Sequence, residues 1–160
     1  MTSAVELLGD RKEKLVVIHQ TGETDFKAVK NGYAAAGFEG AEVMKYINDM
    51  PSYFEQADLV ISRAGATTMA EVAASGKAAL FIPFPFATDD HQRRNAEVFT
   101  SAGAGRMILQ KDLTPERLAG ELKELIDEPA QVNRMEAASR RLGRPDAANR
   151  VVDLVYELAG

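Results

Sequence analysis

Short apolar runs alternate with stretches of helical spacing along the first two thirds of the chain. The runs favour strands and cover residues 14–19, 41–46, 58–62, 78–82 and 106–109. Between them, apolar positions recur with the period of an α-helix over residues 23–36, 49–57, 67–75 and 90–102. Several runs are apolar at successive positions, as strands are when helices cover both faces of a parallel sheet. The alternation predicts an α/β fold: a Rossmann-like, doubly wound parallel sheet with helices on both faces.

After Leu109 the pattern becomes helical only. Thr114 provides an N-cap, Pro115 stands at the first helical position and Glu116 is an early acid. Further helices are expected over residues 130–142 and from Asp146 onward. We therefore expect a single domain over residues 1–160 with a helical tail from about residue 114 to 160.

The beginning of the chain departs from this pattern. A helix-like piece over residues 4–11 leads directly into the first expected strand. In a doubly wound sheet such a helix follows a strand and a glycine-rich turn, and neither stands before it. We therefore expect the first strand to be missing, as if the sequence were cut just downstream of it.

Composition narrows the class of protein. At 160 residues, 46% hydrophobic and 27% charged, the chain has the composition of one globular domain, which argues against disorder. A net charge of −5 gives no general reason to bind nucleic acid or anionic membranes. The absence of cysteine excludes disulfides, thiolate metal sites and cysteine nucleophiles. No signal-peptide pattern and no apolar run of about 20 residues is present, so we expect a cytoplasmic protein.

The most informative segment joins an expected strand to the next helix and reads Ser62-Arg63-Ala64-Gly65-Ala66-Thr67-Thr68-Met69-Ala70-Glu71. The first N–H groups of a helix are free, and the helix dipole favours anions there. Gly65 and Ala66 allow a ligand close to the backbone. Thr67 or Thr68 can cap the helix or bind a phosphate, and Glu71 can accept hydrogen bonds from two ribose hydroxyls. The same residues also fit a plain glycine turn with a threonine cap and a dipole-favoured acid.

A second polar segment leaves the end of the next expected strand, and its sequence from residue 82 to 95 is Ile-Pro-Phe-Pro-Phe-Ala-Thr-Asp-Asp-His-Gln-Arg-Arg-Asn. Open α/β sheets bind ligands at this carboxyl edge. Asp89 or Asp90 can cap the helix that follows. Gln92 and Asn95 are three residues apart and share a helix face, where two amides beside His91 suit a polyhydroxylated ligand. A capped surface helix with polar residues remains the alternative.

Two other strand ends carry polar groups. His19-Gln20-Thr21-Gly22 follows the first run, and His19 is more readily a structural hydrogen-bonding residue than a catalyst. The corner at Ile47-Asn48-Asp49 offers backbone groups that can read a base edge, or simply a helix capped by Asn48 or Asp49.

Other kinds of site find no support. The adjacent Asp89-Asp90-His91 is poorly spaced for metal ligands, so no metal is expected. The chain has no dinucleotide-binding glycine fingerprint, no Walker loop and no nucleophile elbow.

Taken together, these segments resemble a known family. The residues that carry the resemblance are His19-Gln-Thr-Gly, Ile47-Asn-Asp-Met, Ser62-Arg-Ala-Gly-Ala-x-Thr with Glu71, Ile82-Pro-Phe and Asp90-His-Gln-x-x-Asn-Ala. In this order they resemble the C-terminal, nucleotide-sugar-binding half of the MurG family, the peptidoglycan N-acetylglucosaminyltransferases of glycosyltransferase family 28 with a GT-B fold. The resemblance covers nearly the whole chain.

The resemblance implies a donor, UDP-N-acetylglucosamine, and a role for each matching position. The Ile47 backbone would bind uracil, and Glu71 would hold the ribose hydroxyls. Arg63 and the turn formed by Gly65, Ala66, Thr67 and Thr68 would face the diphosphate and the nearby sugar. His91, Gln92 and Asn95 would contact N-acetylglucosamine, although some family members have Gln at position 91. The transfer inverts the anomeric centre, converts lipid I to lipid II, and needs neither a metal nor another cofactor.

The family pattern also implies what this chain lacks. The phosphate loop of Gly-Gly-Ser-x-Gly type and the N-terminal domain, which supplies the acceptor site, the proposed base and the membrane-facing surface, are absent. We therefore expect no catalytic residue here beyond a weak candidate in His19. The chain alone should be inactive, bind its donor weakly and self-associate, whereas the whole enzyme should lie on the cytoplasmic face of the inner membrane. Three alternatives remain: a donor-binding subunit of a split glycosyltransferase, a non-catalytic nucleotide-sugar-binding module and a related epimerase.

Overall fold

Parallel strands form two small sheets in the computed structural model, which describes residues 1–159. One sheet pairs β1 (Val17–Gln20) with β2 (Ala41–Met44), and the other has the order β3 (Leu59–Ser62), β4 (Ala78–Phe81), β5 (Gly105–Met107). No strand pairing joins β1 to β3 within the described residues. The predicted strands are therefore all present, but they do not form one continuous sheet.

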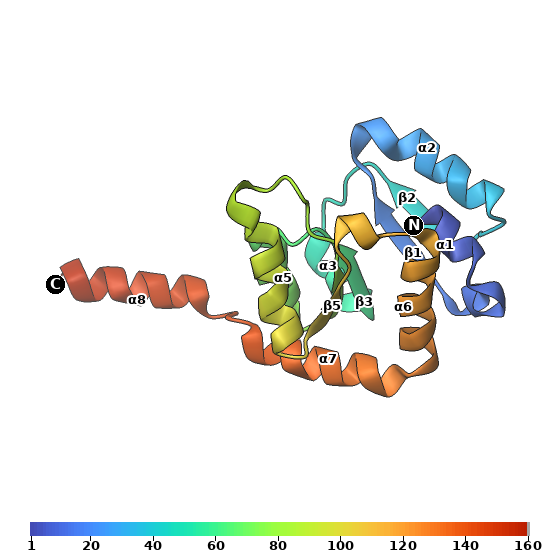
Figure 1. The fold of residues 1–160 in the computed structure, drawn as a ribbon. Coiled ribbons are helices and arrows are strands. Elements are labelled where there is room, and N and C mark those ends of the chain that lie inside the picture. The colour runs from blue at the N-terminus through green and yellow to red at the C-terminus, as the bar shows by residue number, and fades with distance from the viewer. Residues whose placement is uncertain (160) are drawn as a thin grey trace.

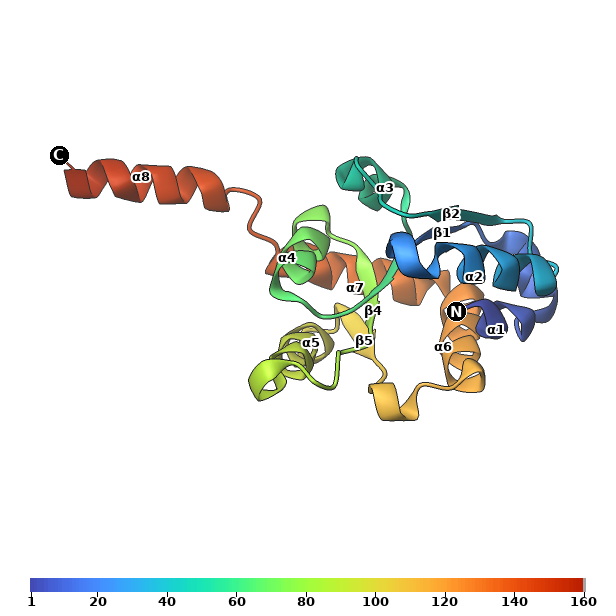
Figure 2. The same cartoon turned by 90° about the horizontal axis from the view of Figure 1, so that it is seen from above.

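Helices alternate with the strands and lie on both sides of the sheets (Figures 1 and 2). They are α1 (Thr2–Glu6), α2 (Gly22–Ala35), α3 (Met50–Gln56), α4 (Ala66–Ser75), α5 (His91–Ser101), α6 (Pro115–Asp127), α7 (Pro129–Leu142) and α8 (Ala147–Ala159). Three 3₁₀ segments cover Gly9–Lys14 (η1), Thr88–Asp90 (η2) and Gln110–Asp112 (η3). The opening helix is shorter than predicted because Gly9 has a φ of +58° and interrupts it, and no strand precedes β1 among residues 1–159.

The central strand β4 shows why the sequence folds this way. All four of its residues are buried. Leu80 belongs to the apolar cluster formed with α1 and α6, whereas Phe81 belongs to the cluster formed with α4, α5 and α7. The Phe81 and Phe99 rings meet edge to face with centroids 5.1 Å apart. Burying a Leu or Phe side chain is worth roughly 1.5–3 kcal/mol, so apolar residues on both faces hold helices against both sides of the strand.

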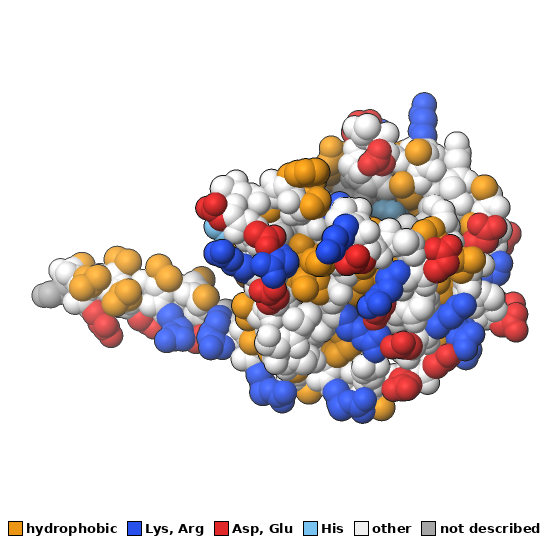
Figure 3. All heavy atoms as spheres, viewed as in Figure 1, with side chains coloured by type: hydrophobic (Ala, Val, Ile, Leu, Met, Phe, Trp, Pro, Cys, Tyr) orange, Lys and Arg blue, Asp and Glu red, His pale blue; other side chains and the backbone are white. Residues whose placement is uncertain are grey.

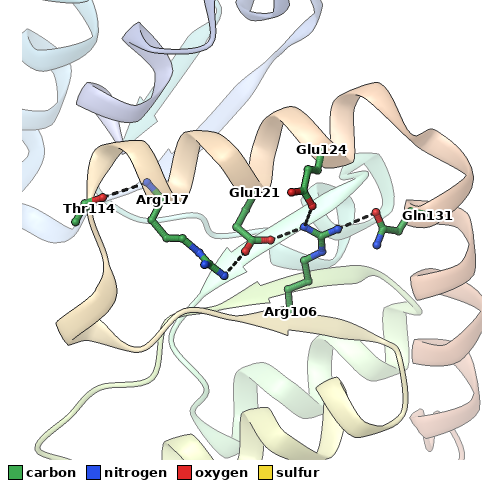
Figure 4. A network of polar contacts seen from close by, with 6 residues as sticks. All are labelled: Arg106, Thr114, Arg117, Glu121, Glu124 and Gln131. Carbon is green, nitrogen blue, oxygen red and sulfur yellow. Dashed lines mark hydrogen bonds and ion pairs between the residues drawn. The ribbon is translucent and has the colours of Figure 1, made fainter.

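A polar network fastens the last strand to the two helices that follow (Figure 4). The Arg106 guanidinium on β5 donates to Glu121 and, at 2.8 Å, to Glu124, both on α6. Its other terminal nitrogen donates to Gln131 on α7 at 2.8 Å. Arg117 also donates to Glu121, at 2.6 Å. One cation thus connects three elements.

Helix α8 projects away from the rest of the molecule (Figures 1 and 2). The chain leaves the body at Gly143, where a Cβ would lie 2.5 Å from the Ala73 carbonyl oxygen, so only glycine fits there without displacement. None of the residues of α8 is buried. Its apolar side chains gather along one side of the helix (Figure 3) and include Val151, Val152, Val155 and Leu158. No helix in the described part of the chain is long and apolar enough to cross a membrane.

Candidate functional site

The carboxyl ends of β3, β4 and β5 are held together by one side chain. Nη1 of Arg63 donates to the carbonyl oxygens of Ile82 at 3.0 Å and Pro83 at 3.3 Å, and to Oε1 of Gln110 at 2.7 Å. The guanidinium carbon also lies 5.6 Å from the centre of the Phe84 ring, within the range of a cation–π contact. Arg63 was predicted to bind substrate, and in this arrangement its guanidinium joins the loops that surround the predicted site.

Helix α4 begins at this carboxyl edge of the sheet and has no side-chain cap. Gly65 is the N-cap residue, with φ −66° and ψ 146°, and no side chain accepts a hydrogen bond from the first turn. Thr67 and Thr68 lie inside the first turn, so the alternative in which a threonine caps this helix is wrong. Ala66 and Thr67 are exposed. The free N–H groups and the dipole of α4 therefore face an accessible position that favours an anion.

Glu71 lies on the same face of α4 as Thr67 and Thr68, because residues three and four apart are neighbours on a helix. Helical side chains tilt toward the helix N-terminus, so the Glu71 carboxylate leans toward the uncapped turn. Glu71 is exposed and has no hydrogen-bond or ion-pair partner among residues 1–159. A free carboxylate beside an anion-favouring turn can accept hydrogen bonds from the hydroxyls of a bound nucleotide.

Gln92 and Asn95 share one face of α5, as their spacing predicted, and both side chains bind the turn that precedes α4. Oε1 of Gln92 accepts from the backbone N–H of Ala64 at 3.2 Å and of Phe84 at 2.9 Å. Nδ2 of Asn95 donates to the Ala64 carbonyl oxygen at 3.1 Å. Ala64 is fully buried. Both polar groups of one backbone unit are therefore held by α5, and direct contact of these amides with a sugar stays a prediction.

The start of α5 is unusual in its backbone. Asp89 and Asp90 have φ values of +49° and +58°, in the left-handed region that non-glycine residues seldom adopt. Asp90 occupies the predicted N-cap position of α5, but its side chain accepts no hydrogen bond from the first turn of the helix, and its carboxylate pairs with Arg93. Next to it, His91 is exposed and has no hydrogen-bond partner within the described residues. Strained backbone of this kind is concentrated at binding sites.

The predicted base-reading corner follows β2. Asp49 caps α3 by accepting from Ser52, through its backbone N–H at 3.4 Å and its hydroxyl at 2.5 Å. The Ile47 N–H is already engaged, because it donates to Oε1 of Gln20 at 2.8 Å. The corner lies beside α4, since Met50 packs in the same apolar cluster as Met69.

His19 lies at the end of β1 in a structural contact. Its Nδ1 is 3.0 Å from the Tyr33 hydroxyl, and the two rings meet edge to face. Burial, followed by the positive charge of the chain's amino terminus, lowers the pKa of His19. Burial raises the pKa of Tyr33 to about 12. A lowered pKa favours the neutral form of the imidazole, and a catalytic role for His19 stays a prediction.

Sequence reasoning missed two residues that organise this edge. Gln20 binds the Ile47 backbone, and Gln110 binds Arg63. Gln20 had a recognisable signal, because it belongs to the polar segment His19-Gln20-Thr21-Gly22 at the end of the first expected strand. Gln110 follows β5 and could be placed only once β5 was known to lie beside β4. Among residues 1–159 no group of three His, Asp or Glu side chains is arranged to hold a metal ion.

Known proteins match this chain along nearly its full length. Residues 1–151 match the glycosyltransferase family 28 C-terminal domain. An N-acetylglucosamine transferase of Myxococcus xanthus, named for UDP-N-acetylglucosamine and N-acetylmuramyl-(pentapeptide) pyrophosphoryl-undecaprenol, is 47% identical over 158 residues, 99% of this chain and 41% of the relative. The transferase of the same name from Geotalea daltonii is 49% identical over 153 residues, 96% of this chain and 42% of the relative. The chain thus spans about two fifths of the length of these relatives.

Solved structures agree with this relationship. The crystal structure of Acinetobacter baumannii MurG superposes with a TM-score of 0.82 at 34% identity, covering 97% of this chain and 49% of that one. The glycosyltransferase of kitacinnamycin superposes with a TM-score of 0.66 at 25% identity, covering 94% of this chain and 38% of that one. The fold is that of one half of a GT-B glycosyltransferase, and the chain belongs to the glycosyltransferase family 28 C-terminal domain family.

Proposed function

We propose that this chain is the UDP-N-acetylglucosamine-binding part of a peptidoglycan N-acetylglucosaminyltransferase, an inverting, metal-independent enzyme that converts lipid I to lipid II. The names and identities of its relatives support the activity and the donor. The observation that carries the proposal is the uncapped N-terminus of α4 beside the free carboxylate of Glu71. A nucleoside diphosphate needs both features: N–H groups for its phosphates and an acceptor for its ribose hydroxyls.

In the proposed complex the diphosphate lies against Gly65–Thr68 and the ribose against Glu71. Uracil lies at the Ile47 backbone. Because the Ile47 N–H donates to Gln20 in the free chain, the base either displaces the Gln20 amide or uses only the Ile47 carbonyl. The sugar extends toward the start of α5, where His91 is exposed.

The remaining parts of the reaction belong to other residues of the whole enzyme. Transfer needs an acceptor held in line with the donor and a base to take its proton. We propose that an N-terminal domain supplies both, binds lipid I and keeps the enzyme on the cytoplasmic face of the inner membrane. The 160-residue chain alone is then inactive in lipid II formation and binds its donor weakly.

Substitution of Glu71 tests the proposal. Hydrogen bonds to a charged group are worth roughly 1.5–3 kcal/mol, so Glu71→Ala should weaken UDP-N-acetylglucosamine binding by about 10- to 150-fold. Amide chemical-shift titration of the chain measures this even for a weak ligand. The control is Glu39→Ala, which removes the same charge from an exposed residue just before the N-terminal end of β2, away from the carboxyl ends of the strands. It should leave the affinity for UDP-N-acetylglucosamine unchanged. Equal affinities for the wild type and Glu71→Ala would refute the assignment of Glu71.

A further inference from the structure

Two side chains of α5 hold both hydrogen-bonding groups of Ala64, the residue just before the N-cap of α4. Two N–H donors converge on one atom of Gln92, which must therefore be the amide oxygen. The Ala64 carbonyl oxygen needs a donor, which the amide nitrogen of Asn95 provides. The orientation of both amides is thus fixed by the backbone that they bind.

This arrangement determines where the first turn of α4 points. Gly65 has no side chain to anchor it, and no side chain caps the helix. The peptide units on either side of Ala64 are instead oriented from outside, by α5. The same Gln92 oxygen also holds the Phe84 N–H, and Phe84 lies against Arg63. The β3–α4 turn and the β4–α5 loop are therefore both hydrogen-bonded to the same oxygen atom of Gln92.

We infer that Gln92 and Asn95 are positioning residues, which act through Ala64 to aim the N–H groups of α4 at the donor diphosphate. The inference rests on the proposed function and adds this role to direct sugar contact, which stays a prediction. The outer ends of the two amides, Nε2 of Gln92 and Oδ1 of Asn95, have no partner among residues 1–159. Their backbone-facing ends are the engaged ones, so their loss acts first on the turn.

Sugar contact and positioning of the turn predict different losses of affinity for UDP and for UDP-N-acetylglucosamine. A residue that touches the sugar affects UDP-N-acetylglucosamine and leaves UDP almost unaffected. A residue that aims the turn at the diphosphate weakens both ligands by the same factor, since both carry the diphosphate. Losing a neutral hydrogen bond typically changes an equilibrium about three- to tenfold, which sets the expected size of the effect.

The experiment combines amide hydrogen exchange with ligand titration in the 160-residue chain. Gln92→Met should speed exchange of the Ala64 and Phe84 amides about three- to tenfold, whereas Gln92→Glu, whose carboxylate oxygen still accepts both N–H groups, should restore protection. Gln92→Met and Asn95→Leu should each weaken the binding of UDP, which has no N-acetylglucosamine to contact, as well as the binding of UDP-N-acetylglucosamine. Val98→Ala, at an exposed position on the same helix, is the control and should change neither measurement.

Each outcome decides between the roles. Unchanged exchange in Gln92→Met, or loss of UDP-N-acetylglucosamine binding with UDP binding intact, overturns the inference. If Gln92→Met does not fold, the comparison of the two ligands in Asn95→Leu decides the question alone. A wild-type chain that binds neither ligand overturns the proposed function, and the exchange data then still show whether Gln92 holds the turn.

Discussion

At the scale of single residues, the imidazole of His19 makes stability depend on pH. Its pKa is lowered from the usual 6.5 by burial and by the amino terminus. Below pH 6.5 the unfolded chain therefore binds more protons at this position than the folded chain. The contribution of His19 to stability is complete above pH 6.5 and is lost as the pH falls toward the lowered pKa.

Urea unfolding at pH 7.5 and 5.5 measures this effect. We expect the free energy of unfolding to fall between these pH values in the wild type, and to fall less in His19→Gln. Glutamine keeps a hydrogen-bonding group near the Tyr33 hydroxyl but does not titrate in this range. If the two proteins lose the same stability, His19 is not the group responsible.

The sequence predicted residue roles where the interaction is local. Thr114 accepts from the Arg117 N–H at 3.1 Å, and Asp49 caps α3 by the same short-range geometry. Roles that depend on distant partners were not predictable. Gln92 binds the backbone of a residue 28 positions earlier, and nothing in its spacing identifies that partner. The sheet edge at which these side chains gather was predictable, but the partner of each side chain was not.

At the scale of elements, the Arg106 network predicts which contacts matter for the docking of α6 and α7 (Figure 4). Arg106 and Glu121 have side-chain exposures of 20% and 11%, so their interaction is only partly screened by water. Arg106→Met should lower the free energy of unfolding by about 1–3 kcal/mol, since charge-assisted bonds to both helices are lost.

Arg117→Met is the matched control for that prediction. Arg117 shares Glu121 as its partner, but its side chain is 57% exposed and the pair lies within one helix. Exposed pairs of this spacing are worth only about 0.3–0.5 kcal/mol. Equal destabilisation by the two substitutions, measured by chemical unfolding, would mean that the contact between β5 and the two helices does not contribute to the free energy of unfolding.

The order and type of the elements could be predicted because period and burial agree along most of the chain. The four buried residues of β4 follow from an uninterrupted apolar run. Two features were not predictable. The separation of β1 from β3 depends on which strands pair, and the break in the first helix depends on the left-handed backbone of Gly9.

At the scale of the whole molecule, the apolar side of α8 predicts association. Val155 is 58% exposed and shares a helix face with Val151, Val152 and Leu158, which are three or four residues away. Figure 3 shows the apolar side chains of α8 along one side of the helix. Contiguous exposed apolar surface of this kind drives contact with another surface. We expect the average mass of the 160-residue chain in sedimentation equilibrium to rise with concentration, and Val155→Glu to reduce that rise.

Asn149→Glu adds the same charge to the polar side of α8 and serves as the control for that substitution. It should leave the association unchanged. If both variants reduce the association equally, charge repulsion and not the apolar side explains the effect. A wild-type chain that stays monomeric at all concentrations would contradict the prediction itself.

The isolation of α8 has a further consequence for the energetics of docking. The helix has 13 residues and none of them is buried, so little besides its own backbone hydrogen bonds stabilises it. Isolated helices of about 12–15 residues or fewer are marginally stable in water, because nucleation is costly. Undocked α8 therefore exchanges between helix and coil. Contacts with any surface that binds it must also offset the conformational entropy that the helix loses on ordering. Part of the binding energy is spent on folding, which makes the contact specific for an amphipathic groove and readily reversible.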